Sequence, residues 1–339
     1  MPVTLAQAQV NTQDDVAYAI IDNLRRYSWV LDQMVFDDTV TPGTGGATLT
    51  YGYTRLSSAR SASFRAYNSE YQRDKAERER VTVDLKPLGG AYAIDRTLAN
   101  LGQAATNETA FQLQQLLTSI RIRFIEELIN GDVASDEIGF DGLDTILSDA
   151  DTEHTADEGM QDIRPSTINE TSLAMAALDE LDEWLSGIIP STTGGGDLGT
   201  PGAVPPGVKA LLGNTRMVSR IKALARWAGL YTESKDDVGR HVSMYGDWVL
   251  IDAGDNATGT ESIISTGGSS GNSALYAVTF GMDALHGAAV AGSPLLQQWA
   301  PDYTTAGAVK AGEVEMGPVA LAVKNTKSCG VMRDIRITG

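Results

Sequence analysis

Cysteine is almost absent from this chain of 339 residues, and its single copy, Cys329, has no partner with which to close an intrachain disulfide. This usage is typical of proteins made in a reducing compartment, and we expect Cys329 to be a small core residue. Basic residues are also scarce: 26 lysines and arginines stand against 44 acids, which gives a formal net charge of −18. Because affinity for nucleic acid comes mainly from Lys and Arg displacing counterions, this charge argues against a nucleic-acid-binding role.

Long apolar runs are missing as well. None approaches the roughly 18 apolar residues needed to span a membrane. The N-terminal MPVTLAQAQVNTQDD lacks the positive start and apolar centre of a signal peptide, so we expect neither a membrane partner nor secretion. Apolar residues make up 42% of the chain, which is ordinary for a globular protein, and the length allows one or two domains.

Two glycine-rich segments have the spacing of enzyme motifs but not their structural context. Gly194-x-Gly196-x-x-Gly199 lies in a loop with no strand before it and prolines after it, where a pyrophosphate-binding helix must begin. Gly267-x-Ser269-x-Gly271 leads into a strand-like segment, whereas a hydrolase nucleophile elbow needs a strand before it and a helix after it. We therefore expect no catalytic residue and no cofactor, and a hydrolase remains only a remote alternative.

Acids dominate residues 132–162, where eleven occur without a single Lys or Arg. The composition predicts a solvated, mobile linker with one short apolar anchor at residues 140–147. A calcium loop beginning at Asp149 fails the pattern, because His154 replaces the glycine of the sharp turn and Met160 the bidentate glutamate. No metal ligand is expected here.

What the chain does contain is a pair of alternating segments on either side of a charged stretch. Apolar and polar residues alternate over residues 62–67 and again over 81–86, which predicts a two-stranded ribbon with one apolar face. Such a ribbon is barely stable alone in water, so we expect it to lie across another subunit. The candidate subunit-contact residues are the four acids and four bases between the two segments: Glu70, Arg73, Asp74, Lys75, Glu77, Arg78, Glu79 and Arg80.

Apolar residues at helical spacing predict helices over residues 14–34, 107–130, 169–184 and 214–228. The second is the longest, roughly 35 Å at the usual rise. We expect Gly131 to end it in a left-handed conformation. Its predicted buried stripe consists of Leu113, Leu117, Ile120, Phe124 and Leu128.

The helix over residues 214–228 is strongly basic in an otherwise acidic chain. Its charge suits an acidic neighbour and equally a solvated helix face. Strand-like segments precede and follow it, at residues 208–212, 242–252, 274–280 and 314–337. The mixture predicts an α+β protein. The basic residues are Arg216, Arg220, Lys222 and Arg226.

The order of segments resembles a major capsid protein of a tailed bacteriophage with the Hong Kong 97-like fold. The matching segments are VTLAQAQVNT, SWVLDQMVFDDTVTPGTGGATLTYGYTRL, RERVTVDLKPLGGAYAIDRTLANLG, NETAFQLQQLL, INGD and GFDGLDTIL. They follow one another in family order over residues 2–147, while the remainder matches only in its general alternation of helices and strands. The GFDGLDTIL segment after a long helix ending in INGD is the most specific part.

This resemblance implies an α+β subunit with an N-terminal arm (1–43), an extended β-ribbon loop (44–88) and a peripheral domain with a long spine helix (89–160). An axial domain (161–300) and return strands of the peripheral domain (301–339) complete it. The implied function is that of a structural, non-enzymatic virion protein that self-assembles into an icosahedral shell enclosing phage DNA.

The implied partners are copies of the chain as pentamers and hexamers, a portal, a scaffolding protein and in some cases a decoration protein. Packaged DNA would be enclosed without specific binding, and assembly would take place in the bacterial host cytoplasm. An encapsulin-like compartment shell of the same fold, enclosing protein cargo, is the nearest alternative. A secreted or surface-binding module is the alternative from another class, disfavoured by the missing signal peptide.

Overall fold

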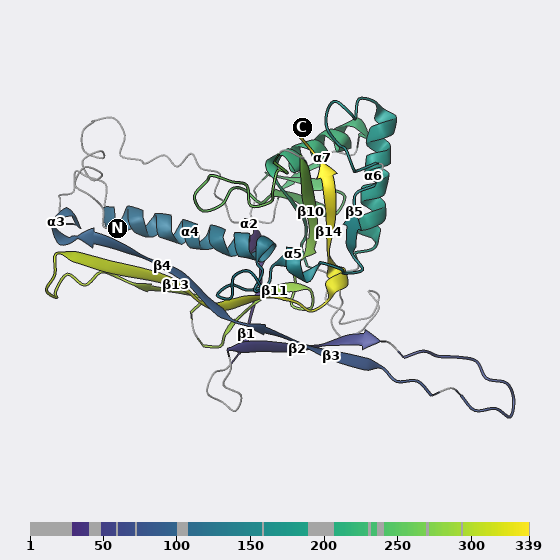
Figure 1. Ribbon diagram of the computed structural model, residues 1–339, viewed down its shortest axis with the longest axis horizontal. Coiled ribbons are helices and arrows are strands. Elements are labelled where there is room, and N and C mark those ends of the chain that lie inside the picture. Colours follow the sequence, from purple (N-terminus) through teal and green to yellow (C-terminus); the bar gives the residue numbers. More distant parts are fainter. Residues whose placement is uncertain are drawn as a thin grey trace.

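The computed structural model combines a long helix, two sheets and a projecting two-stranded ribbon (Figure 1). An elongated body carries the long helix α4, a more compact lobe stands at one end of it, and the ribbon extends below and beyond both. The structure describes residues 29–40, 49–58, 60–71, 73–99, 108–157, 159–188, 207–229, 232–235, 241–268, 271–292 and 294–338.

The elongated body is built on a five-stranded sheet. Its long strands β4 (Lys86–Asp95) and β13 (Val309–Val323) pair antiparallel, and the far side of β13 pairs with β12 (Leu296–Trp299) and β11 (Leu285–Val290). Strand β1 (Phe36–Val40) adds to β11 in parallel. The short helices α2 (Trp29–Gln33) and α3 (Arg96–Ala99) flank this sheet, and α4 (Glu108–Asn130) runs along it (Figure 1).

The compact lobe is built on a seven-stranded sheet in the order β5-β14-β10-β6-β9-β8-β7. Helices α6 (Thr171–Ser186) and α7 (Thr215–Trp227) cover one of its faces. The remaining elements are α5 (Leu143–Ile146), β5 (Glu153–Thr155), β6 (Lys209–Gly213), β7 (Thr232–Lys235), β8 (His241–Tyr245), β9 (Trp248–Asp252), β10 (Asn272–Thr279), a 3₁₀ turn (Thr326–Ser328) and β14 (Cys329–Arg336).

The predicted helices over residues 107–130, 169–184 and 214–228 are confirmed as α4, α6 and α7. Asn214 begins α7 by accepting a hydrogen bond from the Met217 amide on its side chain, as a good N-cap residue does. Of the helix expected at residues 14–34, residues 14–28 lie outside the described residues, and α2 is its described part. Cys329 is fully buried, and burial raises the pKa of its thiol to about 11.

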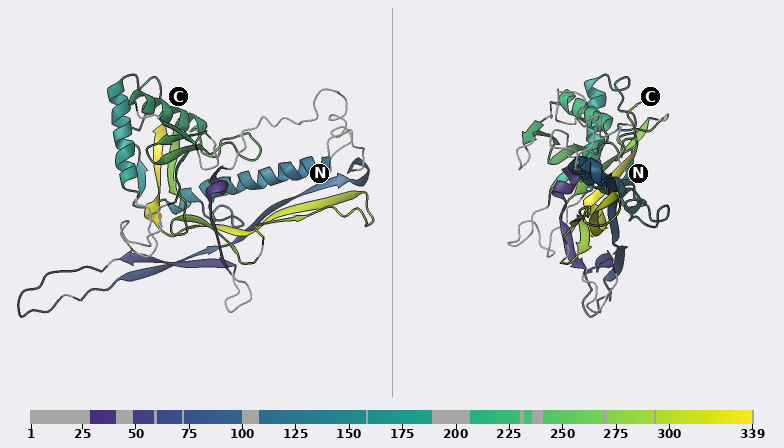
Figure 2. Two further views of the ribbon diagram at one scale, coloured as in Figure 1. Left: turned by 180° about the vertical axis from the view of Figure 1, so that it is seen from behind. Right: turned by 90° about the vertical axis from the view of Figure 1, so that its left-hand side faces the viewer.

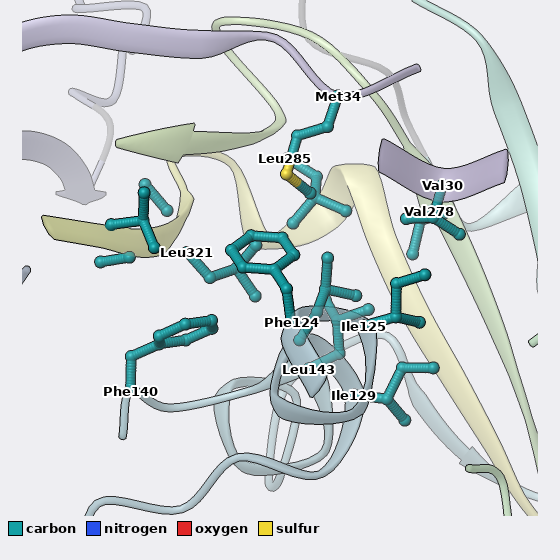
Figure 3. Close-up of a cluster of buried hydrophobic side chains, with 14 of the residues drawn as sticks. Val30, Met34, Phe124, Ile125, Ile129, Phe140, Leu143, Val278, Leu285 and Leu321 are labelled. Atoms are coloured by element: carbon teal, nitrogen blue, oxygen red, sulfur yellow. The ribbon is translucent and has the colours of Figure 1, made fainter. Parts of the chain in front are cut away.

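Helix α4 is buried mainly along its C-terminal half. Phe124, Ile125 and Leu128 lie in the main apolar cluster, where Figure 3 shows Phe124 and Ile125 among side chains from the two sheets and from α2. Leu113 and Leu117 are only half-buried. The predicted stripe therefore lies on the correct side of the helix, but its first two residues are not part of the buried core. The apolar face therefore fixes one end of the helix more firmly than the other.

The segment after α4 is compact and hydrogen-bonded, which corrects its prediction as a solvated, mobile linker. Phe140 and Leu143 are buried against α4, as the predicted apolar anchor requires. Its acids are also engaged: Asp144 and Glu153 both accept hydrogen bonds from the Arg333 guanidinium on β14. The charge composition of the segment could not predict this pairing, because the arginine lies about 180 residues further along the chain.

Gly131 ends α4, but it does so without the left-handed conformation that was expected, because its φ is not positive. A Cβ at this position would lie 2.2 Å from the Phe140 carbonyl oxygen and 2.5 Å from that of Glu127. The Gly131 amide donates to Glu127, and the Gly142 amide donates back to Gly131. Close backbone packing between the INGD and GFDG segments therefore explains the glycine.

The two sheets do not divide at residue 300, where the sequence boundary was placed. Strands β11 and β12 precede that boundary and belong to the sheet of the elongated body, whereas β14 follows it and pairs with β10 in the lobe. The chain therefore crosses from one sheet to the other several times, so no single residue boundary separates the two sheets.

Candidate assembly surface

The projecting ribbon pairs β2 (Thr50–Ser58) with β3 (Glu77–Asp84) in antiparallel register. The sequence predicted the second strand and misplaced the first: residues 62–67 form no strand, and Phe64 is fully exposed. Residues 62–67 alternate between apolar and polar side chains, but among the described residues they pair with no other strand and bury no side chain. Residues 60–71 and 73–76 instead form the long loop at the free end of the ribbon (Figure 1).

Side chains of β2 attach the base of the ribbon to the end of β13. The Tyr53 hydroxyl donates to the Val323 carbonyl at 2.9 Å. The Arg55 guanidinium donates to the same carbonyl and to that of Lys324, at 2.9 and 3.2 Å. These hydrogen bonds join side chains of β2 to the backbone at the end of β13. They therefore fix the orientation of the ribbon relative to the body.

A buried polar cluster lies beneath the same attachment. The Tyr51 hydroxyl donates to Asp37 at 2.7 Å and lies 3.2 Å from His286 Nε2, and Lys324 Nζ approaches the Asp37 carboxylate at 3.8 Å. His286 is fully buried on β11. The cluster therefore ties β1, β2 and β11 together at the point where the ribbon begins.

The titration of this cluster follows from its burial. Burial, helped by the Lys324 charge, lowers the pKa of His286 to about 4. Burial and the hydrogen bond to Asp37 raise the pKa of Tyr51. Burial alone would raise the pKa of Asp37, but hydrogen bonds from Tyr51 and Thr39 and the Lys324 charge outweigh it and lower that pKa. At neutral pH the cluster thus holds a carboxylate and a neutral imidazole.

The sequence pattern pointed to the free end of the ribbon and not to this cluster. The alternation of Tyr51, Tyr53 and Arg55 was the available signal, since long side chains with polar ends at every second position fit a strand lying on a protein surface. His286 gave no signal, because its partners are distant in sequence.

All eight predicted contact residues are exposed, and they lie along one arm of the ribbon from its free end into β3. Three of them, Asp74, Lys75 and Glu77, have partners within the ribbon. Asp74 accepts hydrogen bonds from the backbone and hydroxyl of Ser61 at 2.8 and 2.6 Å, which hold the two arms of the loop together. Lys75 pairs with Glu77 at 2.7 Å. No ion pair joins Arg73, Arg78 or Arg80 to another described residue.

The structure separates the charges of β3 by face. Side chains alternate along a strand, so Glu77 and Glu79 share a face with the half-buried Val81, while Arg78 and Arg80 lie on the opposite face. Leu56, opposite Arg78 in the ladder, is 60% exposed on that second face. The ribbon therefore presents a face of arginines and one apolar side chain rather than a uniform mixture of charge.

Three aromatic side chains stand out at the free end of the ribbon. Phe64 and Tyr67 are almost fully exposed, and Tyr71 is 62% exposed with the Arg65 guanidinium over its ring. Exposed aromatics on a projecting loop are typical of protein contact sites, because such side chains gain most from burial.

Other kinds of site find little support among the described residues. No group of three or more histidine, cysteine, aspartate and glutamate side chains there is arranged to hold a metal ion. None of the described helices is both long and apolar enough to cross a membrane.

Comparison with known proteins identifies the fold through structure alone. No family model matches the sequence, and no curated protein matches it. Among solved structures, the SrpI encapsulin of Synechococcus elongatus PCC 7942 superposes with a TM-score of 0.62 at 11% identity, covering 100% of this chain and 98% of that one. The capsid of a native GTA particle gives a TM-score of 0.59 at 10% identity, with 95% and 94% covered.

The capsid of the Myoviridae phage XM1 is similar over 98% of both chains, with a TM-score of 0.56 at 12% identity. These similarities extend over the whole chain, including the part that the sequence resemblance did not reach. The chain therefore has the Hong Kong 97-like capsid fold, an α+β architecture that it shares with shell-forming capsid and encapsulin proteins.

Proposed function

We propose that the chain is the major capsid subunit of a tailed bacteriophage and self-assembles into an icosahedral shell around DNA. The observation that carries the proposal is the ribbon, which projects from the body of a chain with a capsid fold and exposes its arginines and aromatics to solvent. A two-stranded ribbon gains little stability alone, so its free end needs a second copy to lie upon. The role is structural rather than catalytic.

The parts of the subunit have the following proposed roles. Of the predicted arm (1–43), residues 1–28 are an arm across a further subunit contact, whereas residues 29–40 belong to the body through α2 and β1. Residues 44–88, which include the ribbon, overlap a neighbour. The sheet of β4 and β13 with α4 is the peripheral domain, and the lobe of α6 and α7 is the axial domain. The interleaving of the sheets supports assigning residues 285–299 to the peripheral domain and β14 to the axial domain.

The wider proposal concerns partners and location. Copies of the chain would form pentamers and hexamers in a virion, assembled in the cytoplasm of a bacterial host. A portal and a separate scaffolding protein would take part, with a decoration protein as a further proposed partner. The charge of −18 suits packaged DNA that is enclosed without specific binding, since an acidic lining repels phosphate.

Electron microscopy of the purified chain tests assembly directly. We expect rings or closed shells, alone or after co-expression with a scaffolding protein. Sedimentation that shows only a 36.0 kDa monomer under both conditions, over a range of salt and protein concentration, would contradict the proposal.

An encapsulin-like compartment shell is a second candidate, favoured by the similarity to the SrpI encapsulin over the whole of this chain. The two candidate functions predict particles with different contents. Particles isolated from the native source should contain nuclease-protected DNA if the chain is a phage capsid subunit. A second protein in fixed ratio, with no protected DNA, would instead establish the compartment shell.

A further inference from the structure

Helices α6 and α7 carry opposite charges, most of which have no ion-pair partner among the described residues. Four acids and no base occur in α6, and four bases and no acid occur in α7. The two helices pack through one apolar cluster that includes Leu181 and Trp184 from α6 and Ile221 and Leu224 from α7. Within the described residues, however, no ion pair joins them, so their contact is apolar and their charged faces point elsewhere.

One charged side chain of each helix is bound to the backbone of the lobe. Glu180 of α6 accepts hydrogen bonds from the backbone amides of Asp157 and Met160, at 2.7 and 2.6 Å. Arg220 of α7 donates to the Ile163 carbonyl at 2.6 Å. These two residues fix the helices on the lobe, and the remaining charges are left for the surface.

The outward charges form a stripe on each helix. On α6, Asp179 and Glu183 are four residues apart on the exposed side, and Met175 precedes them in the same row with 51% of its surface exposed. Asp182 lies beside them and accepts a hydrogen bond from Tyr245. We call this surface, made by Met175, Asp179, Asp182 and Glu183, the acidic face.

On α7, Arg216 and Arg226 are exposed, and Lys222 is half-buried between them. Trp227, the last residue of the helix, has 47% of its surface exposed. No acid of a described residue pairs with any of the three cations. We call the surface of Arg216, Lys222, Arg226 and Trp227 the basic face.

We propose that the basic face of one copy docks on the acidic face of a second copy of this chain. The inference rests on the proposed function and names a contact within the shell. Each face pairs three charges of one sign with a large exposed apolar side chain, which is the composition of a protein interface with a buried anchor and a charged rim. Like charges would repel if either face met its own copy, so the contact joins different surfaces.

The geometry of the lobe suits such a head-to-tail contact. Helix α6 runs along the edge of the lobe furthest from α4, and α7 lies inward of it (Figures 1 and 2). A contact between two different surfaces repeats from copy to copy, and it closes into a ring when the rotation per copy divides a full turn. The proposed contact therefore favours rings of the chain.

Charge reversal on each face, separately and together, tests the pairing. One variant carries Arg216→Glu and Arg226→Glu, a second carries Asp179→Lys and Glu183→Lys, and a third combines all four. We expect each single-face variant to need at least a tenfold higher protein concentration for assembly than the wild type. The combined variant should recover assembly, because its two faces are again complementary.

Arg121→Glu is the control for charge reversal elsewhere on the subunit, since Arg121 is exposed on α4, outside both faces. Thermal melting of all variants should stay close to that of the wild type. If the wild type assembles and a single-face variant assembles equally well, or if the combined variant fails to recover, the docking is refuted while the capsid function stands. Loss of DNA binding without loss of assembly in the α7 variant would assign the basic face to nucleic acid instead. A wild type that never assembles would refute both proposals.

Discussion

At the residue scale, the buried cluster of Asp37, Tyr51 and His286 makes the attachment of the ribbon sensitive to acid. His286 has a pKa near 4 in the folded chain and an ordinary value near 6.5 when unfolded. Between those values the unfolded chain binds a proton that the folded chain does not. The free energy of unfolding should therefore fall as the pH is lowered from 6.5 to 4, and stay level above 6.5.

The whole effect is on the order of 3 kcal/mol, at 1.36 kcal/mol for each tenfold difference in proton affinity. Denaturant unfolding of the unassembled subunit across this pH range measures it, and His286→Gln should remove most of the slope. Asp37 does not contribute to this slope. Because its pKa is lowered in the folded chain, its protonation reduces the free energy of unfolding only below about pH 3.8. An equal slope in the variant would show that His286 is not the titrating group.

A second residue-scale prediction concerns the glycine that ends α4. Gly131→Ala would place a Cβ against two carbonyl oxygens of the backbone, neither of which can rotate away. We expect a loss of roughly 1–3 kcal/mol in stability, as for other forms of overpacking. Gly281→Ala is the matched control, because a Cβ there has no neighbour within 4 Å. A Gly131→Ala variant as stable as this control would show that the two segments separate easily.

At the element scale, α4 should respond to truncation differently along its length. Phe124 is completely buried between Phe36 and Phe140, so Phe124→Ala should cost about 3–5 kcal/mol and leave much of the protein insoluble. Leu117 is only half-buried, so Leu117→Ala should cost less and leave a soluble, folded subunit. Thermal melting with the exposed Gln114→Ala as a control distinguishes the two. Equal losses would mean that the stripe is buried throughout.

The ribbon and α4 show how far sequence periodicity can predict structure. A helix carries its own hydrogen bonds, so apolar spacing was sufficient to predict α4 to within a residue. A strand needs a partner, and the alternation at residues 62–67 had none, whereas β2 is fixed by the distant contacts of Tyr53 and Arg55 with β13. The charged residues of the ribbon, α6 and α7 could be recognised from the amino-acid composition of these segments. Their orientation required the fold.

At the scale of the whole molecule, the subunit exposes its strongest contact features far from its core. The free end of the ribbon lies well away from the body (Figure 1), and neither the ribbon arginines nor the aromatics of this end belong to the main apolar cluster. The acidic and basic faces likewise lie on the outer sides of α6 and α7. Changes at these surfaces should therefore alter assembly while leaving the folding of the isolated subunit intact.

The ribbon offers the clearest test of this separation, through Arg78→Glu combined with Arg80→Glu. Both side chains are exposed on one face of β3 and have no ion pair within the described residues, so the melting temperature of the subunit should hardly change. In the shell the same reversal would place two acids against an overlapped neighbour. Each exposed charge pair contributes only about 0–1 kcal/mol. The loss nevertheless recurs at every copy, so we expect assembly to fail.

Arg78→Lys with Arg80→Lys is the matched control, because it keeps the charge and removes only the planar guanidinium. Light scattering and electron microscopy should show shells for the lysine variant and none for the glutamate variant. Shells formed equally well by both would mean that this face of the ribbon is solvated in the assembly. The overlap would then have to rest on the opposite face, that of Glu77 and Glu79, or on the aromatics of the free end.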